Sequence, residues 1–206
     1  MQCLSLKQRF ESLRPYVDII IFMVTLLVAN YAWKWTMIGD EHGDSVTWLG
    51  LDITAPFEFM ACHIASVVYW LVSLFRDSAY MTDAHTIRFA PGSGTTIIWG
   101  CTALKQSFIW LCLIFTVKSS TTTFGKALWL KKLWFIPLGW VCCYLFNILR
   151  IFLIALFIEH HPEWFHLLHD YIFKYLFYAM LFGLWVWFVE GIRGADVSPS
   201  SEEPNV

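Results

Sequence analysis

Side chains that could act together in catalysis lie in three separate parts of the sequence. Cys101 follows Gly100 at the start of an apolar run. Arg150 lies inside another strongly apolar stretch, where a permanently charged guanidinium is costly to bury unless it serves a function. Four histidines follow Arg150 in the sequence: His160, His161, His166 and His169. These residue types could supply a nucleophile, an electrostatic partner and a proton carrier.

The position of Cys101 favours a reactive thiol. We expect a helix to begin at this residue, and a helix N-terminus carries partial positive charge and free N–H groups. Both would stabilise a thiolate, which is the nucleophilic form of cysteine. The alternative is a buried structural cysteine, which is our interpretation of the other five of the 6 cysteines, since most of them lie in apolar segments.

Arg150 is accompanied by Asn147, which lies one helical turn earlier and therefore on the same helix face. Arginines inside a membrane usually face a polar cavity and mark a functional site. The alternative is an arginine whose aliphatic stem lies in lipid while its charged end reaches the surface. A neighbouring asparagine argues against that alternative, because it adds a second polar group to the same face.

Among the histidines, His169 has the best-defined position because it stands directly before the last apolar segment. Its hydrogen-bond partner is either Asp170 or a backbone carbonyl, and His166 lies about one turn earlier on a similar face. A metal site is an alternative, since four imidazoles and the neighbouring acids are enough ligands. The spacing matches no specific metal motif, so we predict neither a metal nor another cofactor.

The composition indicates where these residues must be held. The chain of 206 residues is 58% hydrophobic and 15% charged, whereas a soluble domain carries about 25% charge. Its 12 Trp and 18 Phe suit aromatic side chains that face lipid or the membrane surface. We therefore predict an all-α polytopic membrane protein, a bundle of four to five transmembrane helices without a separate soluble domain. No basic run suggests binding to nucleic acid.

The elements that would position the three groups can be placed along the chain. Apolar segments that could form membrane helices cover residues 17–35, 56–75, 101–117, 133–158 and 171–190. Polar connections lie between them: an acidic loop at 36–55, a lysine-rich segment at 118–132 and a histidine-rich connection at 159–170. In 85–99, the β-prone runs "HTIRF" and "TTIIW" flank "APGSG", which predicts a small hairpin or structured loop before Cys101.

These segments predict one catalytic domain. Residues 1–16 form a polar, basic N-terminal segment, and residues 17–190 form a single transmembrane catalytic bundle. Residues 191–206 are polar, and we expect a disordered tail.

The orientation follows from lysines and arginines in short loops, which favour the cytoplasmic side. The N-terminal segment and residues 118–132 should be cytoplasmic, and Arg193 agrees. Cys101 and Arg150 then lie near the outer face, Arg150 roughly 26 Å along its helix. Residues 56–75 should be re-entrant or lie at the interface, since a full crossing would place the N-terminus outside.

Taken together, the three groups predict a cysteine hydrolase or transpeptidase. A thiolate attacks a peptide carbonyl, and a histidine takes and returns the proton. An arginine stabilises the oxyanion or pairs with the thiolate. Water or another nucleophile then resolves the acyl-enzyme.

The order of "GCTALKQ", "NILRI" and "HD" before the final span resembles the exosortase/archaeosortase family, over roughly residues 50 to 190. The matching residues are Cys101, Thr102, Asn147, Arg150 and His169. His166 could align in place of His169 if a gap is allowed. Ala103 stands where many members have glycine. The chain is most similar to the compact members of the family.

The resemblance implies that Cys101, Arg150 and His169 are catalytic. It implies supporting or substrate-binding roles for three further residues: Asn147, Thr102 and His166. The substrates would be secreted proteins whose C-terminal sorting signal combines a short motif, a transmembrane helix and a basic cluster. Cleavage would take place at the outer face of the cytoplasmic membrane, with transfer of the new C-terminus to a lipid or glycan acceptor.

Two other classes of protein remain open. A non-enzymatic membrane protein could bind haem or metal through its histidines, with His63 and His166 as axial ligands on facing helices. A transporter or assembly factor could use Arg150 to bind a substrate anion, and Cys101 would then be dispensable.

Overall fold

The chain folds mostly into helices. The computed structural model describes residues 2–39, 45–89, 92, 94–117, 125–158 and 160–196. Its α-helices are α1 (Gln2–Thr36), α2 (Thr54–Ser73), α3 (Leu104–Thr116), α4 (Gly125–Ile158) and α5 (Phe173–Asp196). The acidic residues Asp40, Glu41 and Asp44 of the predicted loop lie outside the described residues.

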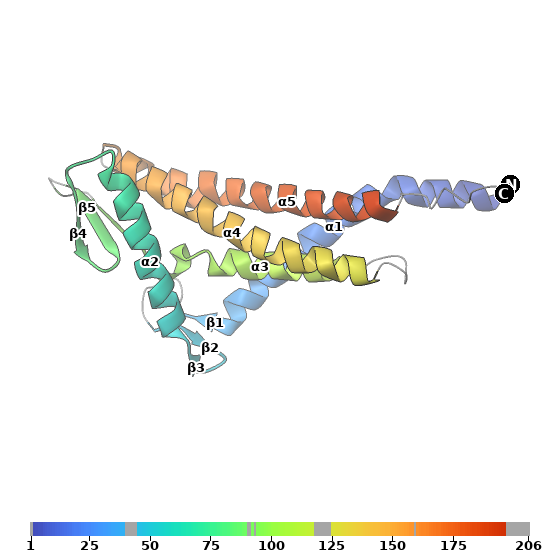
Figure 1. Cartoon of the computed structure of the whole chain (residues 1–206), viewed down its shortest axis with the longest axis horizontal. Helices are drawn as coiled ribbons and strands as arrows, with labels where there is room; N and C mark the ends of the chain where they lie inside the picture. Colours follow the sequence, from blue (N-terminus) through green and yellow to red (C-terminus); the bar gives the residue numbers. More distant parts are fainter. Residues whose placement is uncertain are drawn as a thin grey trace, which may run out of the picture.

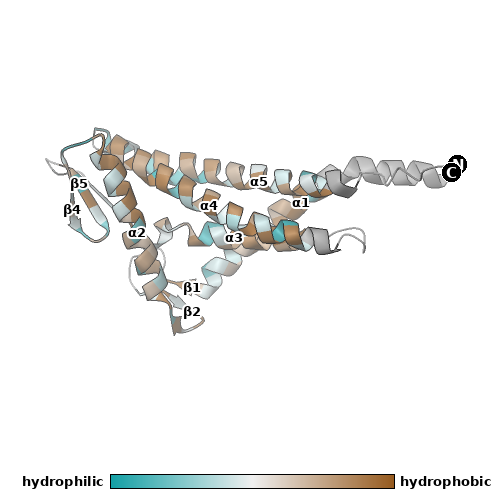
Figure 2. Ribbon diagram, in the orientation of Figure 1, coloured by the Kyte–Doolittle hydropathy of each residue, from teal (hydrophilic) through white to brown (hydrophobic). Residues whose placement is uncertain are grey.

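Four of the described helices are long and apolar enough to cross a membrane. The segments concerned are Tyr16–Thr36, Thr54–Ser73, Trp129–Ile158 and Pro162–Ile192. Helix α3 is apolar but has only 13 residues. Figure 2 shows that α4 and α5 are hydrophobic along most of their length. These features are consistent with the helical multi-pass membrane protein that the composition predicts.

Helices α3, α4 and α5 lie along one common direction, and α1 crosses α3 (Figure 1). The Lys131 amino group near the start of α4 donates a hydrogen bond to the Gly191 carbonyl near the end of α5. Neighbouring helices α4 and α5 are therefore antiparallel. Figure 1 also shows that α1 begins and α5 ends at the same end of the molecule, whereas α2 and both small sheets lie at the other end.

Close contact between α3 and α4 depends on a glycine. A side chain on Gly139 would overlap the Trp110 ring, so only glycine lets the indole lie against the α4 backbone. The Trp110 Nε1–H donates to the Phe135 carbonyl at 3.0 Å. Small residues commonly allow such close approach between membrane helices. This contact fixes α3, and with it the segment that carries Cys101, relative to α4.

The helices extend further than the hydropathy pattern predicts. Helix α1 begins at Gln2 and includes the polar N-terminal segment, and α4 begins at Gly125, eight residues before its predicted start. The prediction of a polar connection throughout 118–132 was therefore wrong for the part from residue 125 on.

The Lys132 amino group in this part of α4 lies 5.8 Å from the Phe115 ring and 5.6 Å from the Trp129 ring, so its stem is covered by aromatic residues. Helix α5 continues to Asp196, and the rest of the predicted tail lies outside the described residues.

The predicted hairpin before Cys101 is present as part of a three-stranded sheet. Its strands are β4 (Ala79–Asp83), β5 (Thr86–Phe89) and β6 (Gly94–Thr96). Strands β5 and β6 pair antiparallel with Thr86 opposite Thr96, as the two β-prone runs predict. Strand β4 was not predicted. The expected acidic loop contains a second small antiparallel sheet of β1 (Met37–Ile38), β2 (Thr47–Trp48) and β3 (Leu51–Asp52).

Helix α2 is a single helix of 20 residues. It contains no internal turn and is long and apolar enough to cross a membrane. The prediction that this segment is re-entrant or lies at the interface stays a prediction. Two polar side chains interrupt its apolar run. The Ser66 hydroxyl donates to the Cys62 carbonyl within the helix, and His63 hydrogen-bonds to the Tyr144 hydroxyl on α4. In Figure 1, α2 runs steeply across the direction shared by α3, α4 and α5.

Candidate active site

Cys101 lies in a tight turn and not at the start of a helix. A 3₁₀ turn, Trp99–Cys101, ends at this residue, and α3 begins three residues later at Leu104. Ala103, the residue before α3, has a left-handed backbone with φ of 61°, which costs about 1–2 kcal/mol for a residue other than glycine. The left-handed residue separates the two elements. The prediction that a helix begins at Cys101 was therefore wrong.

The environment of Cys101 favours the neutral thiol. Burial raises the pKa of this thiol above its ordinary value, and the charge of Arg150 together with a hydrogen bond from the Ile98 backbone opposes that rise only in part. The thiolate is therefore not formed in advance at neutral pH, contrary to the expectation from a helix N-terminus. A nucleophilic role for Cys101 requires a base beside it.

Two buried side chains hold the turn that carries Cys101. The Thr102 hydroxyl donates to the Trp99 carbonyl at 2.7 Å, closing the turn on itself. The Asn147 side-chain amide on α4 donates to the Cys101 carbonyl. Both Thr102 and Asn147 are almost fully buried. Each side chain donates to a backbone carbonyl of the turn that carries Cys101. In the structure both residues therefore position Cys101.

His169 lies opposite Cys101 in a helical turn that the sequence did not predict. The segment Leu167–Ile172 is a π-helix leading directly into α5, so the end of the predicted connection at 159–170 is helical. Such wide turns are rare and often occur at functional sites. The His169 Nε2 atom lies 3.9 Å from the Cys101 Sγ atom. The Phe165 ring stacks on the imidazole with centroids 5.1 Å apart.

The other ring nitrogen of His169 selects its tautomer. The His169 Nδ1 atom lies 2.8 Å from the Asp170 Oδ1 atom. Because an ionised carboxylate only accepts hydrogen bonds, Nδ1 carries the proton, and the Nε2 lone pair of the neutral ring faces the Cys101 thiol. A proton can therefore pass from sulfur to Nε2.

The contacts of His166 differ from those of His169. Its Nδ1 atom lies 3.1 Å from the second oxygen of Asp170, Oδ2, and its side chain is 83% exposed. Asp170 thus bonds to two imidazoles, but only the His169 ring reaches Cys101. Of the two histidines that the sequence left open, the geometry favours His169 as the base.

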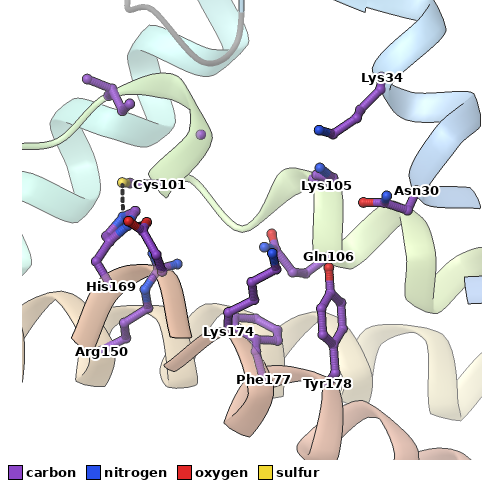
Figure 3. A pocket seen from close by; sticks show the side chains of 13 residues that line it. Asn30, Lys34, Cys101, Lys105, Gln106, Arg150, His169, Lys174, Phe177 and Tyr178 are labelled. Atoms are coloured by element: carbon purple, nitrogen blue, oxygen red, sulfur yellow. Dashed lines mark hydrogen bonds and ion pairs between the residues drawn. The ribbon is translucent and has the colours of Figure 1, made fainter. Parts of the chain in front are cut away.

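Arg150 lies on α4 beside this pair, and it is only 8% exposed. Its side chain lines the same cavity as Cys101 and His169 (Figure 3). Its buried Nε–H has no hydrogen-bond acceptor among the described residues. A buried donor without an acceptor is costly, so this atom can gain most from an oxygen atom of a bound molecule.

The cavity has a volume of about 520 Å³ and extends well beyond the three predicted residues. Further polar residues that line it are Asn30, Lys34, Lys105, Gln106, Lys174 and Tyr178. None of the three lysines was predicted to belong to the site. Each stands within three residues of the end of an apolar helix, where lysines commonly reach toward the surface. Nothing in the sequence separates a lysine that turns inward from one that turns outward.

The histidines do not form a metal site in the part of the chain that the structure describes, which leaves out Glu159. No group of three His, Cys, Asp or Glu residues there is placed to hold a metal ion. His63 bonds to the Tyr144 hydroxyl at 2.9 Å, and His161 lies 3.1 Å from a Glu163 oxygen. His63 and His166, the pair considered for haem, therefore each have a different protein partner.

Comparison of the chain with models of known protein families, with curated proteins and with solved structures gives no match. We therefore infer function from the geometry of the cavity. Three helical segments bring a thiol, an imidazole held by a carboxylate, and a buried guanidinium to one place. This arrangement can carry out acyl transfer through a cysteine nucleophile.

Proposed function

We propose that the protein is a membrane-embedded cysteine peptidase or transpeptidase. Its substrates are secreted proteins with a C-terminal sorting signal, as the resemblance to the exosortase/archaeosortase family suggests. The observation that carries the proposal is the 3.9 Å approach of His169 Nε2 to Cys101 Sγ, with Asp170 fixing the tautomer of the imidazole. Arg150 lines the same cavity, and its buried Nε–H, which has no acceptor in the part of the chain that the structure describes, could donate to an oxyanion.

In the first half of the reaction, His169 Nε2 takes the thiol proton as the Cys101 sulfur attacks the peptide carbonyl carbon. An S–C bond forms, and the carbonyl oxygen becomes an oxyanion that Arg150 can stabilise. The C–N bond then breaks, and the leaving amine takes the proton from the imidazolium. The product is a thioester on Cys101. Asp170 favours the imidazolium that exists between the two proton transfers.

In the second half, a hydroxyl or amine, or water, attacks the thioester. Its proton passes to His169 Nε2, the C–S bond breaks, and the sulfur takes the proton back. Water as the nucleophile gives a peptidase, and another molecule gives a transpeptidase. Cysteine, histidine and arginine thereby return to their starting states.

The proposed orientation in the membrane places this site toward the outer face. In this proposal α1, α4 and α5 cross the bilayer, and α3, with only 13 residues, returns the chain across it. Helix α2 is long enough to span a membrane but is proposed to stay near the outer surface beside the two sheets. The common end of α1 and α5 in Figure 1 supports this topology, because four crossings put both ends of the chain on one side. Lys131 and Lys132 belong to that end, which is therefore cytoplasmic.

A second candidate is a transporter or assembly factor that binds an anion. The lining of the cavity favours it, since Arg150 and three lysines are among the described residues that line the space. Such a protein does not need the Cys101 thiol. Its activity would survive replacement of that residue and would be lost with Arg150.

The proposal is tested by processing of secreted proteins of the same organism that end in a shared motif, an apolar helix and a basic cluster. Each of these secreted proteins is co-expressed with the wild-type protein or with one of two variants, Cys101→Ala or His169→Ala. Cleavage of the secreted protein is followed by immunoblotting. We expect both variants to abolish cleavage while remaining in the membrane fraction. Cys62→Ala on α2, a free cysteine outside the cavity, is the matched control and should cleave normally. Cleavage by Cys101→Ala would refute the proposal.

A further inference from the structure

A second buried polar atom of the cavity, besides the Arg150 Nε–H, lacks a partner. Gln106 is the third residue of α3 and lines the same space as Cys101 and His169. Its Oε1 atom is buried and has no hydrogen-bond partner among the described residues. Figure 3 shows the Gln106 side chain to one side of the Cys101–His169 pair. Because a buried acceptor without a donor is costly, this atom gains from a bound molecule that brings an N–H or O–H.

The two atoms are of opposite kinds. Arg150 offers a donor, and Gln106 offers an acceptor. Neither has a partner in the part of the chain that the structure describes, and both belong to side chains that line one cavity. A molecule that satisfies both must therefore carry an acceptor and a donor.

This requirement selects a class of ligand. A carboxylate or an ionised phosphate brings acceptors only, so it would pair with Arg150 and leave the Gln106 oxygen as it is. A peptide main chain has a C=O and, except at proline, an N–H in every unit. A peptide can thus satisfy both atoms, and the Gln106 oxygen favours a peptide over the anion of the second candidate function.

The position of Gln106 relative to Cys101 is fixed by regular structure. The Ser107 N–H donates to the Ala103 carbonyl at 3.0 Å and closes the first turn of α3 around Gln106. One turn further along α3, Trp110 packs against the α4 backbone. A peptide bound to Gln106 is therefore held at a set separation from the sulfur. The cavity volume of about 520 Å³ suits a short peptide segment, since sites for small ligands measure about 300–1,000 Å³.

We propose that Gln106 is a substrate-binding residue whose Oε1 atom accepts a main-chain N–H of the substrate near the scissile bond. Arg150 binds the carbonyl oxygen that Cys101 attacks, so the two side chains hold the peptide at two points. This role rests on the proposed function. Gln106 takes no part in proton transfer, and its contribution is made to the bound substrate and to the transition state alike.

The test compares methylated peptides on two forms of the full-length protein in detergent. The peptides cover the cleaved region of a sorting-signal protein, and each carries one N-methyl group on a main-chain nitrogen near the scissile bond, with the scissile nitrogen unchanged. Methylation removes one N–H donor at a time. KM and kcat are measured for the wild type and for Gln106→Met, which keeps the length of the side chain but has no amide.

Two further variants serve as controls. Gln106→Glu keeps an acceptor oxygen at this position. Thr116→Val changes a residue near the other end of α3 that bonds to the Leu113 carbonyl of its own helix and does not line the cavity. The thermal unfolding midpoint of every variant is recorded, so that a loss of folding is separated from a loss of binding.

We expect one methylated position to raise KM about fivefold or more in the wild type and less than about twofold in Gln106→Met. With the unmodified peptide, Gln106→Met should raise KM by a similar factor and change kcat little, because the contact is the same in both bound states. Gln106→Glu should lie closer to the wild type than Gln106→Met, and Thr116→Val should change KM less than about twofold.

Other results overturn the proposal. Equal penalties from methylation in the wild type and Gln106→Met at every position show that no main-chain N–H reaches Gln106. A fall in kcat at unchanged KM, or the same loss in Thr116→Val, assigns Gln106 a structural role only. If Gln106→Met does not fold, Gln106→Glu takes its place in the comparison, and a KM equal to that of the wild type for every methylated peptide then refutes the site.

The two proposals fail in different ways. Cleavage by the wild type that does not depend on Gln106 leaves the peptidase intact and refutes the peptide contact alone. Absence of cleavage of any peptide or sorting-signal protein by the wild type refutes the proposed function and, with it, the role of Gln106.

Discussion

Replacing Asp170 by asparagine tests the link between the imidazole and the thiol most directly. In the wild type, the Asp170 carboxylate accepts the Nδ1–H of His169 at 2.8 Å and thereby keeps the Nε2 lone pair toward Cys101. An asparagine can present its NH₂ group to Nδ1 instead. The ring proton then moves to Nε2, and the base that faces the sulfur is lost, although the side chains keep nearly the same shape.

The size of the effect follows from the contacts that are lost. A hydrogen bond to a charged group contributes about 1.5–3 kcal/mol, which corresponds to about 10- to 150-fold in rate. Asp170 also favours the imidazolium that forms during the reaction, so the loss should lie toward the upper end of this range. His166 bonds to the other carboxylate oxygen and is largely exposed. Removing His166 should therefore cost less than about threefold, since exposed ion pairs contribute little.

The assay is the rate of cleavage of a sorting-signal substrate in membranes, with His166→Ala as the matched control. A thioester trapped with hydroxylamine reports the first half of the reaction separately. We expect Asp170→Asn to lose acylation while His166→Ala keeps it. Equal rates for Asp170→Asn and the wild type would refute the assignment of His169 as a base oriented by Asp170. A larger loss in His166→Ala than in His169→Ala would move the base to the other ring.

Further predictions concern reactivity and packing. Because burial raises the pKa of Cys101, its alkylation by iodoacetamide in a His169→Ala background should be slow near pH 7 and should accelerate as the pH rises toward that raised value. An unchanged rate between pH 7 and pH 9 would contradict the raised pKa. Arg150→Lys should lose most cleavage activity, since an ammonium lacks the planar fork of donors, and full activity of this variant would limit Arg150 to a simple charge. Gly139→Ala should destabilise the protein by about 1–3 kcal/mol through overlap with Trp110, whereas Gly183→Ala, with open space around it, should be neutral or slightly stabilising in thermal unfolding.

Much of the site could be predicted because its residues stand out against apolar surroundings. Arg150 and Asn147 share a helix face by their spacing alone, and His169 precedes an apolar span. The β5–β6 hairpin could also be predicted, since two β-prone runs flank a segment rich in glycine and proline. These features depend on local periodicity and composition, which the sequence contains directly.

The features that could not be predicted depend on contacts between distant segments. A left-handed Ala103 is unusual, and it is stabilised by the surrounding fold, so a helix start at Cys101 was the natural expectation. The π-helix that carries His169 gives no periodic signal over six residues. The inward direction of Lys105 and Lys174 follows from how the helices pack. In each case, contacts between distant segments select one of several local conformations that the local sequence allows equally well.

The shortness of α3 has a consequence for which nucleophile can complete the reaction. Thirteen residues rise only about 20 Å, against roughly 30 Å for the hydrocarbon layer of a bilayer. In the proposed topology, with the end of α3 at the inner boundary, the scissile bond would have to descend into the outer leaflet to meet the sulfur. Bulk solvent is scarce at that depth, while molecules embedded in the leaflet are concentrated there. The geometry would thus disfavour hydrolysis and leave a long-lived thioester to a membrane-resident partner.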